Sequence, residues 1–178
     1  AQVLVAEHLS LRPTGACFVA PTRSLCREIE QSLRRRMRFL AGPSEVSTSD
    51  SLFDLIQDAE TTVEVMTPER LAYLLRADPE AVLARFGLFI IDEVHSVGDP
   101  GRGWTLEWAL SSLHNLTRTT DHRIVVMSAA IGNRGNIAGW LDPDDTGFHY
   151  SSAWRGPRRV HSIFTTQPDW DKETELPR

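Results

Sequence analysis

The sequence lacks any apolar run near the roughly 20 residues of a membrane-spanning helix, and its start lacks the features of a secretory signal. It has only two cysteines in 178 residues, Cys17 and Cys26, which excludes a disulfide framework and disfavours a four-ligand zinc site. It also lacks basic excess: 19 Lys and Arg against 24 Asp and Glu give a net charge of −5. These absences predict an intracellular protein, cytoplasmic or in a eukaryote nuclear, with no membrane partner, which does not hold nucleic acid by bulk positive charge alone.

What is present is an alternation of short apolar strands with amphipathic helices. Strands are predicted over residues 16–20, 45–48, 62–66, 88–91, 123–127 and 160–164. Helices are predicted over residues 2–11, 22–39, 50–56, 67–75, 105–116 and 133–141. Such an alternation is typical of an α/β fold with a parallel sheet, and 41% hydrophobic residues suffice for one core. After the strand predicted over residues 160–164, the rest of the sequence loses this periodicity.

Two adjacent carboxylates follow the most apolar strand. Leu88 to Ile91 leads directly into Asp92-Glu93-Val94-His95, and the carboxyl ends of strands are where open parallel sheets place their active sites. Asp92 could hold Mg²⁺ through its water shell, while Glu93 could deprotonate a water that attacks a terminal phosphate. The alternative is that both residues merely begin a surface loop. A metal cluster of Asp92, Glu93, His95 and Asp99 is disfavoured, because hydrolytic sites usually draw their histidines from further apart.

Several short segments in a fixed order resemble the motifs of superfamily 2 nucleic-acid helicases. The similarity is to the DExH branch, which contains archaeal repair helicases, exosome-associated RNA helicases and a spliceosomal unwinding ATPase. The segments similar to motifs Ia, Ib, II and III are Ala20-Pro21-Thr22-Arg23-Ser24-Leu25, Thr67-Pro68-Glu69-Arg70-Leu71, Asp92-Glu93-Val94-His95 and Ser128-Ala129-Ala130. Thr48-Ser49-Asp50 and the Arg102-Gly103 stretch with Glu107 are similar to two further segments of that branch.

The resemblance implies the first RecA-like motor lobe of an ATP-dependent helicase over residues 1–165, a P-loop NTPase type of fold with a parallel sheet between helices. Residues 166–178 would be a linker toward a second RecA-like lobe. ATP and Mg²⁺ would bind between the lobes, and hydrolysis would drive movement along single-stranded or partly duplex DNA or RNA. The alternative is a non-catalytic RecA-like lobe that binds nucleic acid or a protein partner.

The resemblance also assigns residues to roles. Asp92, Glu93 and His95 would be catalytic, with Asp92 holding Mg²⁺ through water and His95 communicating with Ser128. Backbone phosphates would be bound at two helix starts and at one further arginine. The residues expected there are Pro21, Thr22, Arg23, Thr67, Pro68, Glu69 and Arg102. The physical basis is that a helix N-terminus offers unpaired amides and a positive dipole end to an anion. Simple capping by Thr22 and Thr67 is the alternative, and Arg102 could instead pair with Glu107.

Two departures from the family pattern stand out. The Gly-rich phosphate loop that ends in Gly-Lys-Ser/Thr should directly precede the first helix, and the 178 residues do not contain it. We therefore expect that the chain begins just after that loop and is inactive as an isolated fragment. Ala130 replaces the usual motif III threonine, which predicts weaker coupling by the segment Ser128, Ala129 and Ala130 rather than weaker hydrolysis.

The tryptophans are less informative. Trp104 and Trp108 are four residues apart and so lie on one helix face, where core packing or a domain interface fits better than base stacking. Trp140 is expected in the core, and Trp154 and Trp170 are expected near the second lobe.

Overall fold

The computed structural model describes residues 1–40, 45–47, 61–101, 103–128, 134–143, 147 and 150. The chain divides into two compact units, Ala1–Asp145 and Thr146–Arg178, and the architecture below is that of the first. No helix among the described residues is long and apolar enough to cross a membrane.

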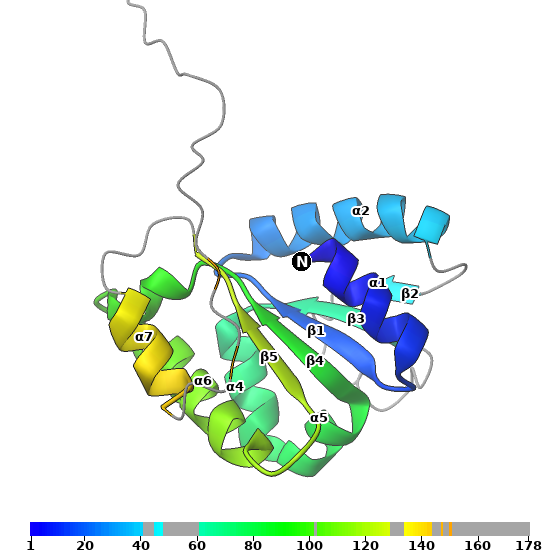
Figure 1. The fold of residues 1–178 in the computed structure, drawn as a ribbon. Coiled ribbons are helices and arrows are strands. Elements are labelled where there is room, and N and C mark those ends of the chain that lie inside the picture. Colours follow the sequence, from blue (N-terminus) through cyan, green and yellow to red (C-terminus); the bar gives the residue numbers. More distant parts are fainter. Residues whose placement is uncertain are drawn as a thin grey trace, which may run out of the picture. The chain divides into compact units, whose positions relative to one another are not determined.

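A parallel sheet of five strands forms the centre of this unit (Figure 1). The strands are β1 (Gly15–Val19), β2 (Glu45–Ser47), β3 (Thr61–Met66), β4 (Phe86–Ile91) and β5 (Arg123–Val126). Their order across the sheet is β2-β3-β1-β4-β5, and every pairing is parallel. Both β1 and β4 are buried along their whole length, which explains why they are apolar without alternation.

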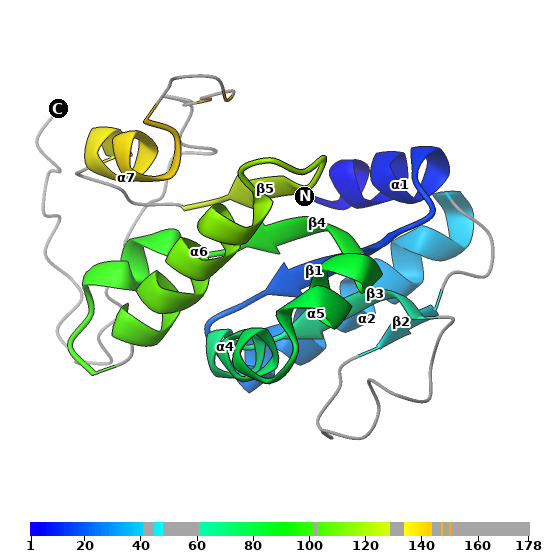
Figure 2. The ribbon, with the colours of Figure 1, turned by 90° about the horizontal axis from the view of Figure 1, so that it is seen from below.

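Helices cover both faces of the sheet, as Figures 1 and 2 show from two directions. One face carries α1 (Gln2–Leu11) and α2 (Arg23–Leu40), whose apolar residues form a core with Phe18, Val65 and Ile90. The other face carries α4, α5, α6 and α7, which span Pro68–Ala77, Pro79–Arg85, Gly103–Thr117 and Arg134–Leu141. A short 3₁₀ helix, η1 (Val94–Gly98), joins β4 to α6. The predicted α/β fold is confirmed.

Most predicted elements match within a few residues, and one helix was not predicted. Helix α5 begins at Pro79, with Asp78 accepting a hydrogen bond from the Ala81 amide at 2.9 Å. This is the same cap-plus-proline signal that correctly predicted α4 from Thr67 and Pro68. The predicted helix after Asp50 and the strand Val160–Phe164 lie outside the described residues.

The tryptophans on α6 differ in their surroundings. Trp108 packs partly against the core and has the Arg76 guanidinium 4.3 Å from its ring centroid. Trp104 is 60% exposed, so core packing, one of the two roles predicted for it, is wrong. The helix turns its buried residues Thr105, Leu106 and Ala109 toward the sheet, which leaves position 104 on the outer side. Trp140 packs partly buried against the same core.

One buried ion pair lies under α5. Glu64 on β3 is 1% exposed, and its Oε2 lies 3.5 Å from Nη2 of Arg85. The Arg85 guanidinium also lies 5.3 Å from the centroid of the Phe86 ring. Burial, together with the charge of Glu64, raises the pKa of the neighbouring Cys17 thiol well above its usual value. Cys17 therefore remains a neutral core thiol.

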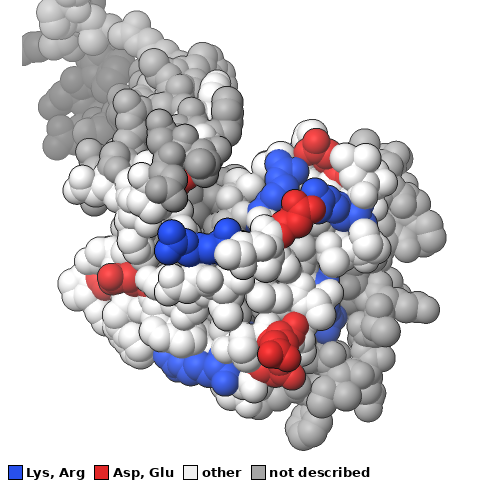
Figure 3. Space-filling view, turned by 60° about the horizontal axis from the view of Figure 1, so that its bottom comes forward, with Lys and Arg blue, Asp and Glu red and all other residues white. Residues whose placement is uncertain are grey.

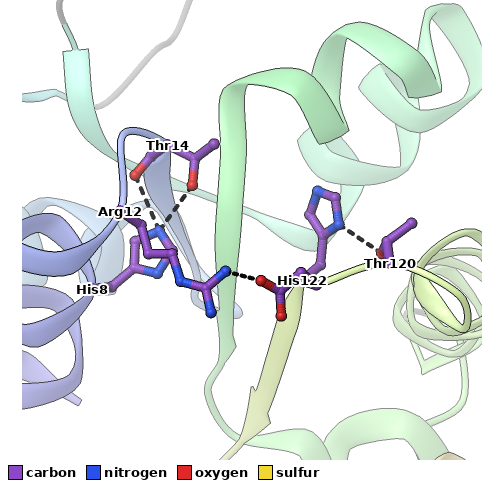
Figure 4. Close-up of polar contacts among 6 residues, drawn as sticks. His8, Arg12, Thr14, Thr120 and His122 are labelled. Carbon is purple, nitrogen blue, oxygen red and sulfur yellow. Dashed lines mark hydrogen bonds and ion pairs between the residues drawn. The ribbon is translucent and has the colours of Figure 1, made fainter.

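The amino edge of the sheet is closed by polar contacts around a buried histidine, shown in Figure 4. His8 of α1 is 3% exposed, and its Nε2 donates to the Thr14 carbonyl at 3.0 Å. Thr14 Oγ1 lies 3.2 Å from the same nitrogen. Burial lowers the pKa of His8, and Arg12 and Arg123 add to this effect. The imidazole is therefore neutral in the folded protein at neutral pH.

The loop before β5 contributes further polar contacts at the amino edge of the sheet. His122 Nε2 donates to the Leu83 carbonyl at 2.9 Å. Its Nδ1 lies 2.7 Å from Thr120 Oγ1 (Figure 4). Arg12 pairs with Asp121, and the guanidinium lowers the pKa of that carboxyl. These contacts tie α1 and the start of β5 to the same end of the sheet.

Candidate active site

The candidate site lies at the carboxyl edge of β1, β4 and β5, where backbone hydrogen bonds continue past the strand ends. Asp92 N donates to the Val19 carbonyl at 2.9 Å, and Met127 N donates to the Ile91 carbonyl at 2.8 Å. Val94 N donates to the Met127 carbonyl at 3.0 Å. The segment after β4 is therefore held between the ends of both neighbouring strands, which fixes the directions of its side chains.

Asp92 and Glu93 are both half-buried at this edge. Oδ1 of Asp92 accepts a hydrogen bond from the Glu93 amide at 2.9 Å, which orients the carboxylate. Glu93 has φ 53° and ψ 43° and is the only non-glycine residue with positive φ in the described part of the chain. A left-handed conformation at such a residue costs roughly 1–3 kcal/mol and persists only where the surroundings enforce it. Backbone strain therefore coincides with the residue predicted to be the base.

His95 connects Glu93 to the end of β5. Its Nδ1 lies 3.1 Å from Oε2 of Glu93 and 3.1 Å from Oγ of Ser128. The contact with Ser128 is a hydrogen bond in which the ring or the hydroxyl donates, according to the tautomer of the imidazole. Oε2 of Glu93 is buried and makes no hydrogen bond within the described part of the chain, so His95 meets it at ion-pair distance only. The ring of His95 therefore lies between Glu93 and Ser128 and contacts both.

The segment that carries these residues is anchored to α6. Ser96 Oγ donates to the Glu93 carbonyl at 2.9 Å, and Gly103 N donates to the Asp99 carbonyl at 3.0 Å. A Cβ at Gly103 would lie 2.2 Å from the Val97 carbonyl oxygen, so only glycine lets α6 begin this close to η1. The first turn of α6 is thus held rigidly against the segment that follows β4.

The two predicted phosphate-binding turns begin α2 and α4. Thr22 Oγ1 accepts from the Leu25 amide at 3.2 Å, and Thr67 Oγ1 accepts from the Arg70 amide at 3.5 Å. Both threonines therefore cap their helices. Pro68 is buried at the first position of α4, whereas Arg23 and Glu69 are exposed. The structure brings Asp92, Glu93, His95 and Ser128 together; Arg102, Ala129 and Ala130 lie outside the described residues.

A cavity of about 240 Å³ lies beside Asp92, between α1, α2 and the ends of β1 and β5. Its wall includes Phe18, Leu33, Asp92 and Met127, together with polar groups of α1 and α2. Gln2 Nε2 donates to Ser32 Oγ at 3.1 Å, which holds the start of α1 against α2 beside this cavity. Asp92 therefore borders a cavity whose wall is mainly apolar.

Mg²⁺ is the metal that the donor set fits. Asp92 and Glu93 supply hard oxygen ligands, and Mg²⁺ commonly keeps most of its water shell and takes only one or two carboxylates. Among the residues that the structure describes, no three His, Cys, Asp or Glu side chains converge as a metal cluster. The arrangement thus fits a hydrated ion better than a dehydrated one.

Three features of this site were not predicted. They are the left-handed backbone of Glu93, the contact of His95 with Glu93, and the close approach of Gly103 to η1. The Gly-Asp-Pro-Gly-Arg-Gly stretch was the available signal for the third, since glycine permits close backbone approach. The helicase resemblance did imply communication between His95 and Ser128, and these side chains lie 3.1 Å apart.

Comparison with known proteins agrees with this geometry. The family model described as DEAD/DEAH box helicase matches residues 1–136. The chain is 33% identical over 132 residues to the ATP-dependent DNA helicase Hel308 of Thermoplasma acidophilum, which covers 74% of the chain and 19% of that protein. It is 29% identical over 187 residues to the Hachiman protein HamB of Bacillus cereus, covering 98% of the chain and 16% of that protein.

A eukaryotic relative is the activating signal cointegrator 1 complex subunit 3 of Gallus gallus, 29% identical over 168 residues, or 90% of the chain and 8% of that protein. The chain thus spans less than a fifth of each of these three relatives. Its parallel sheet between two helical layers is the RecA-like α/β fold, and family membership implies the use of a nucleotide, usually with Mg²⁺. The match over residues 1–136 and the order of its motifs place this chain in the DEAD/DEAH box helicase family.

Proposed function

We propose that this chain is the first RecA-like lobe of an ATP-dependent nucleic-acid helicase and that its carboxyl edge supplies the base for ATP hydrolysis. The observation that carries the proposal is the Asp92, Glu93, His95 and Ser128 arrangement, held between β1, β4 and β5 by backbone hydrogen bonds. A second lobe of the same protein would complete the site. The names of the relatives, which include a DNA helicase, support this reading.

Glu93 is the residue we assign to proton removal. Its carboxylate is half-buried and can accept a proton from a water that attacks the terminal phosphate of ATP. Glu93 has a left-handed backbone and a carboxylate contact with His95, whereas the carboxylate of Asp92 accepts from the Glu93 amide, so we assign the two adjacent carboxylates different tasks. Asp92, whose Oδ1 is oriented by the Glu93 amide, would bind a metal-held water through its second oxygen. Bound Mg²⁺ would supply neutralisation of phosphate charge.

His95 is assigned to positioning and communication. Its Nδ1 lies at ion-pair distance from the Glu93 carboxylate and at hydrogen-bond distance from the Ser128 hydroxyl, so a shift of the ring would affect both residues. Ser128 follows β5 and begins the segment with Ala129 and Ala130, so this contact would link hydrolysis to the segment assigned to coupling. Ala130, without the usual hydroxyl, would weaken this link.

Nucleic acid would be bound through its backbone at the starts of α2 and α4. Both helices have ten or more residues, and their first turns offer amides toward the carboxyl edge. Arg23 is exposed beside the first turn of α2, and Arg102 is proposed as a further phosphate contact. Such contacts carry no sequence information, so binding should be independent of base sequence and weakened by salt.

The decisive test replaces Glu93 in the full protein that carries this chain. Glu93→Gln should lower ATP turnover by roughly 10²–10⁴-fold while nucleotide binding persists, because it removes a base and keeps the shape of the side chain. Glu80→Gln is the matched control, since Glu80 is exposed in the first turn of α5, away from the carboxyl edge. Turnover by coupled assay and nucleotide binding by calorimetry would be compared.

Two outcomes would contradict the proposal. Near-normal turnover of Glu93→Gln would move the base to another residue. Nucleic-acid binding by a wild-type protein that turns over no ATP would favour the non-catalytic alternative.

A further inference from the structure

We propose that Trp104, with Tyr73 beside it, forms a base-stacking platform that extends the nucleic-acid surface along the outer side of α4 and α6. This inference rests on the proposed function, because it assumes that the carboxyl edge faces nucleic acid. The name stacking platform is used below for Tyr73 and Trp104 with their neighbours Arg76 and Trp108.

The starting observation is that two large aromatic side chains are exposed on adjacent helices. Trp104 is 60% exposed and Tyr73 is 48% exposed. An exposed indole is unfavourable in water unless a partner covers it, and tryptophan is enriched where proteins contact ligands. Neither ring contributes to the cores on the two faces of the sheet.

A direct contact one turn away brings the two rings to the same surface. Arg76 of α4 lies over Trp108 of α6, with 4.3 Å between Cζ and the ring centroid. Both helices begin at the carboxyl edge, since each follows a parallel strand, and so they run in the same general direction. Tyr73 precedes Arg76 by three residues and Trp104 precedes Trp108 by four. Both exposed rings therefore lie one turn closer to the carboxyl edge than the Arg76 and Trp108 contact.

The platform is also continuous with the surface proposed to bind phosphates. Tyr73 lies on the helix whose first turn is Thr67-Pro68-Glu69. Trp104 lies in the first turn of α6, directly after Gly103, where a Cβ on residue 103 would lie 2.2 Å from the Val97 carbonyl oxygen. The start of α6 therefore packs closely against η1, which follows the segment of Asp92 and Glu93. A single strand that follows the carboxyl edge would meet the ring directly.

The charge next to Trp104 favours a base over a phosphate as the group bound here. The face shown in Figure 3 carries interspersed basic and acidic side chains, in keeping with the small net charge of −5. Glu107 is exposed one turn after Trp104, which disfavours a phosphate at that place. Aromatic rings bind every base by its π face and need no excess of positive charge. Stacking therefore provides affinity that a chain of net charge −5 would otherwise lack.

The Arg76 guanidinium completes the fit to a nucleic-acid strand. The guanidinium lies over the ring of Trp108, 4.3 Å from its centroid, and places a positive charge one helical turn after Tyr73. A strand with its bases on Tyr73 and Trp104 would thus meet a cation next to the stacked bases. A protein partner would need an apolar contact of larger area than these two rings provide.

The test separates base stacking from phosphate binding. The full protein would be titrated with a labelled thymidine oligonucleotide and with a backbone of the same length that carries no bases, using fluorescence anisotropy. Trp104→Ala should weaken binding of the thymidine strand by about five-fold or more and leave the abasic strand unchanged, because stacking is lost and phosphate contacts remain. Trp104→Phe should restore most of the affinity. Leu116→Ala, at the exposed far end of α6, is the matched control.

The outcomes also distinguish this inference from the proposed function. Arg23→Ala should weaken binding of the thymidine strand and of the abasic strand to the same extent. This result would support the phosphate contacts independently of the result for Trp104→Ala. If Trp104→Ala leaves both strands unchanged while Arg23→Ala weakens both, the stacking platform is overturned and the proposed function stands. Equal binding of the thymidine and abasic strands by the wild-type protein would also overturn it. If neither strand binds at low salt, both proposals fail.

Discussion

The two ends of one sheet carry polar clusters of opposite character, and a histidine lies in each. At the amino edge, His8 is 3% exposed and neutral. Its Nε2 contacts one residue, Thr14, through the carbonyl and the hydroxyl oxygen. At the carboxyl edge, the side chain of His95 is 41% exposed and its Nδ1 has two partners at the same distance, Glu93 and Ser128. One histidine closes the fold, and the other lies between two residues of the candidate site.

The backbone differs between the edges in the same sense. The carboxyl edge has the left-handed Glu93 and the close approach of Gly103 to η1, whereas the amino edge is closed mainly through side chains of α1 and of the loop before β5. In parallel sheets, chemistry belongs at the carboxyl ends, where loops follow the strands and helices begin. Buried polar contacts occur at both edges and so do not by themselves mark a functional site. The carboxyl edge differs in having a histidine in contact with two residues and a non-glycine residue in the left-handed conformation.

Among variants that compare the two edges, replacement of the histidines should have the largest effect. In the full protein, His95→Ala should lower ATP turnover by about ten- to a hundred-fold, because Glu93 loses the contact that positions it. Its melting temperature should change little, since the His95 side chain is 41% exposed. His8→Gln should leave turnover unchanged and lower the melting temperature. Equal loss of turnover in both variants would erase the distinction between the edges.

Glycine substitutions compare the rigidity of the two edges. Gly103→Ala places Cβ 2.2 Å from the Val97 carbonyl, so backbone must move, and we expect a loss of about 2–3 kcal/mol in unfolding free energy. Gly87→Ala places Cβ 2.2 Å from Thr14 Oγ1, a side chain that can rotate, so the loss should be about 1 kcal/mol. Gly139→Ala in α7, with nothing within 4 Å, is the control and should be neutral or stabilising. Urea unfolding measures all three. A smaller loss at position 103 than at 87 would reverse the ranking.

The pH dependence of His8 is the smallest expected effect. Burial lowers its pKa in the folded protein below the ordinary 6.5, with Arg12 and Arg123 contributing. The unfolded chain then binds the proton more tightly, so stability is lost as the pH falls below about 6.5. His8→Gln retains a donor for the Thr14 carbonyl and does not titrate. Its melting temperature should therefore fall less between about pH 7 and pH 5 than that of the wild type. If the melting temperatures of the two proteins fall equally between about pH 7 and pH 5, His8 is not the group whose titration lowers stability.

The limits of sequence reasoning are visible at particular residues. The strands β1 and β4 were predicted because wholly apolar runs of this length are typical of strands buried on both faces. Asp78 and Pro79 carried the same start signal as Thr67 and Pro68 but were not used, and so α5 was missed. Trp104 was expected in the core or at an interface, because the spacing of Trp104 and Trp108 gives a shared helix face without saying which side faces the sheet.

The sequence by itself determined the fold class, the alternation of strands and helices apart from α5, and the positions of Asp92 and Glu93 after β4. These follow from local pattern: apolar period, capping side chains and proline at helix starts. The helicase motifs at the starts of α2 and α4 were assigned from resemblance to that family. Only the tertiary structure decided that Ser128 lies within hydrogen-bond distance of His95, that Glu93 is left-handed and that the ring of Trp104 is turned to solvent. The reason is physical: Ser128 follows β5, 33 residues after His95, and only the parallel pairing of β4 with β5 brings the two together.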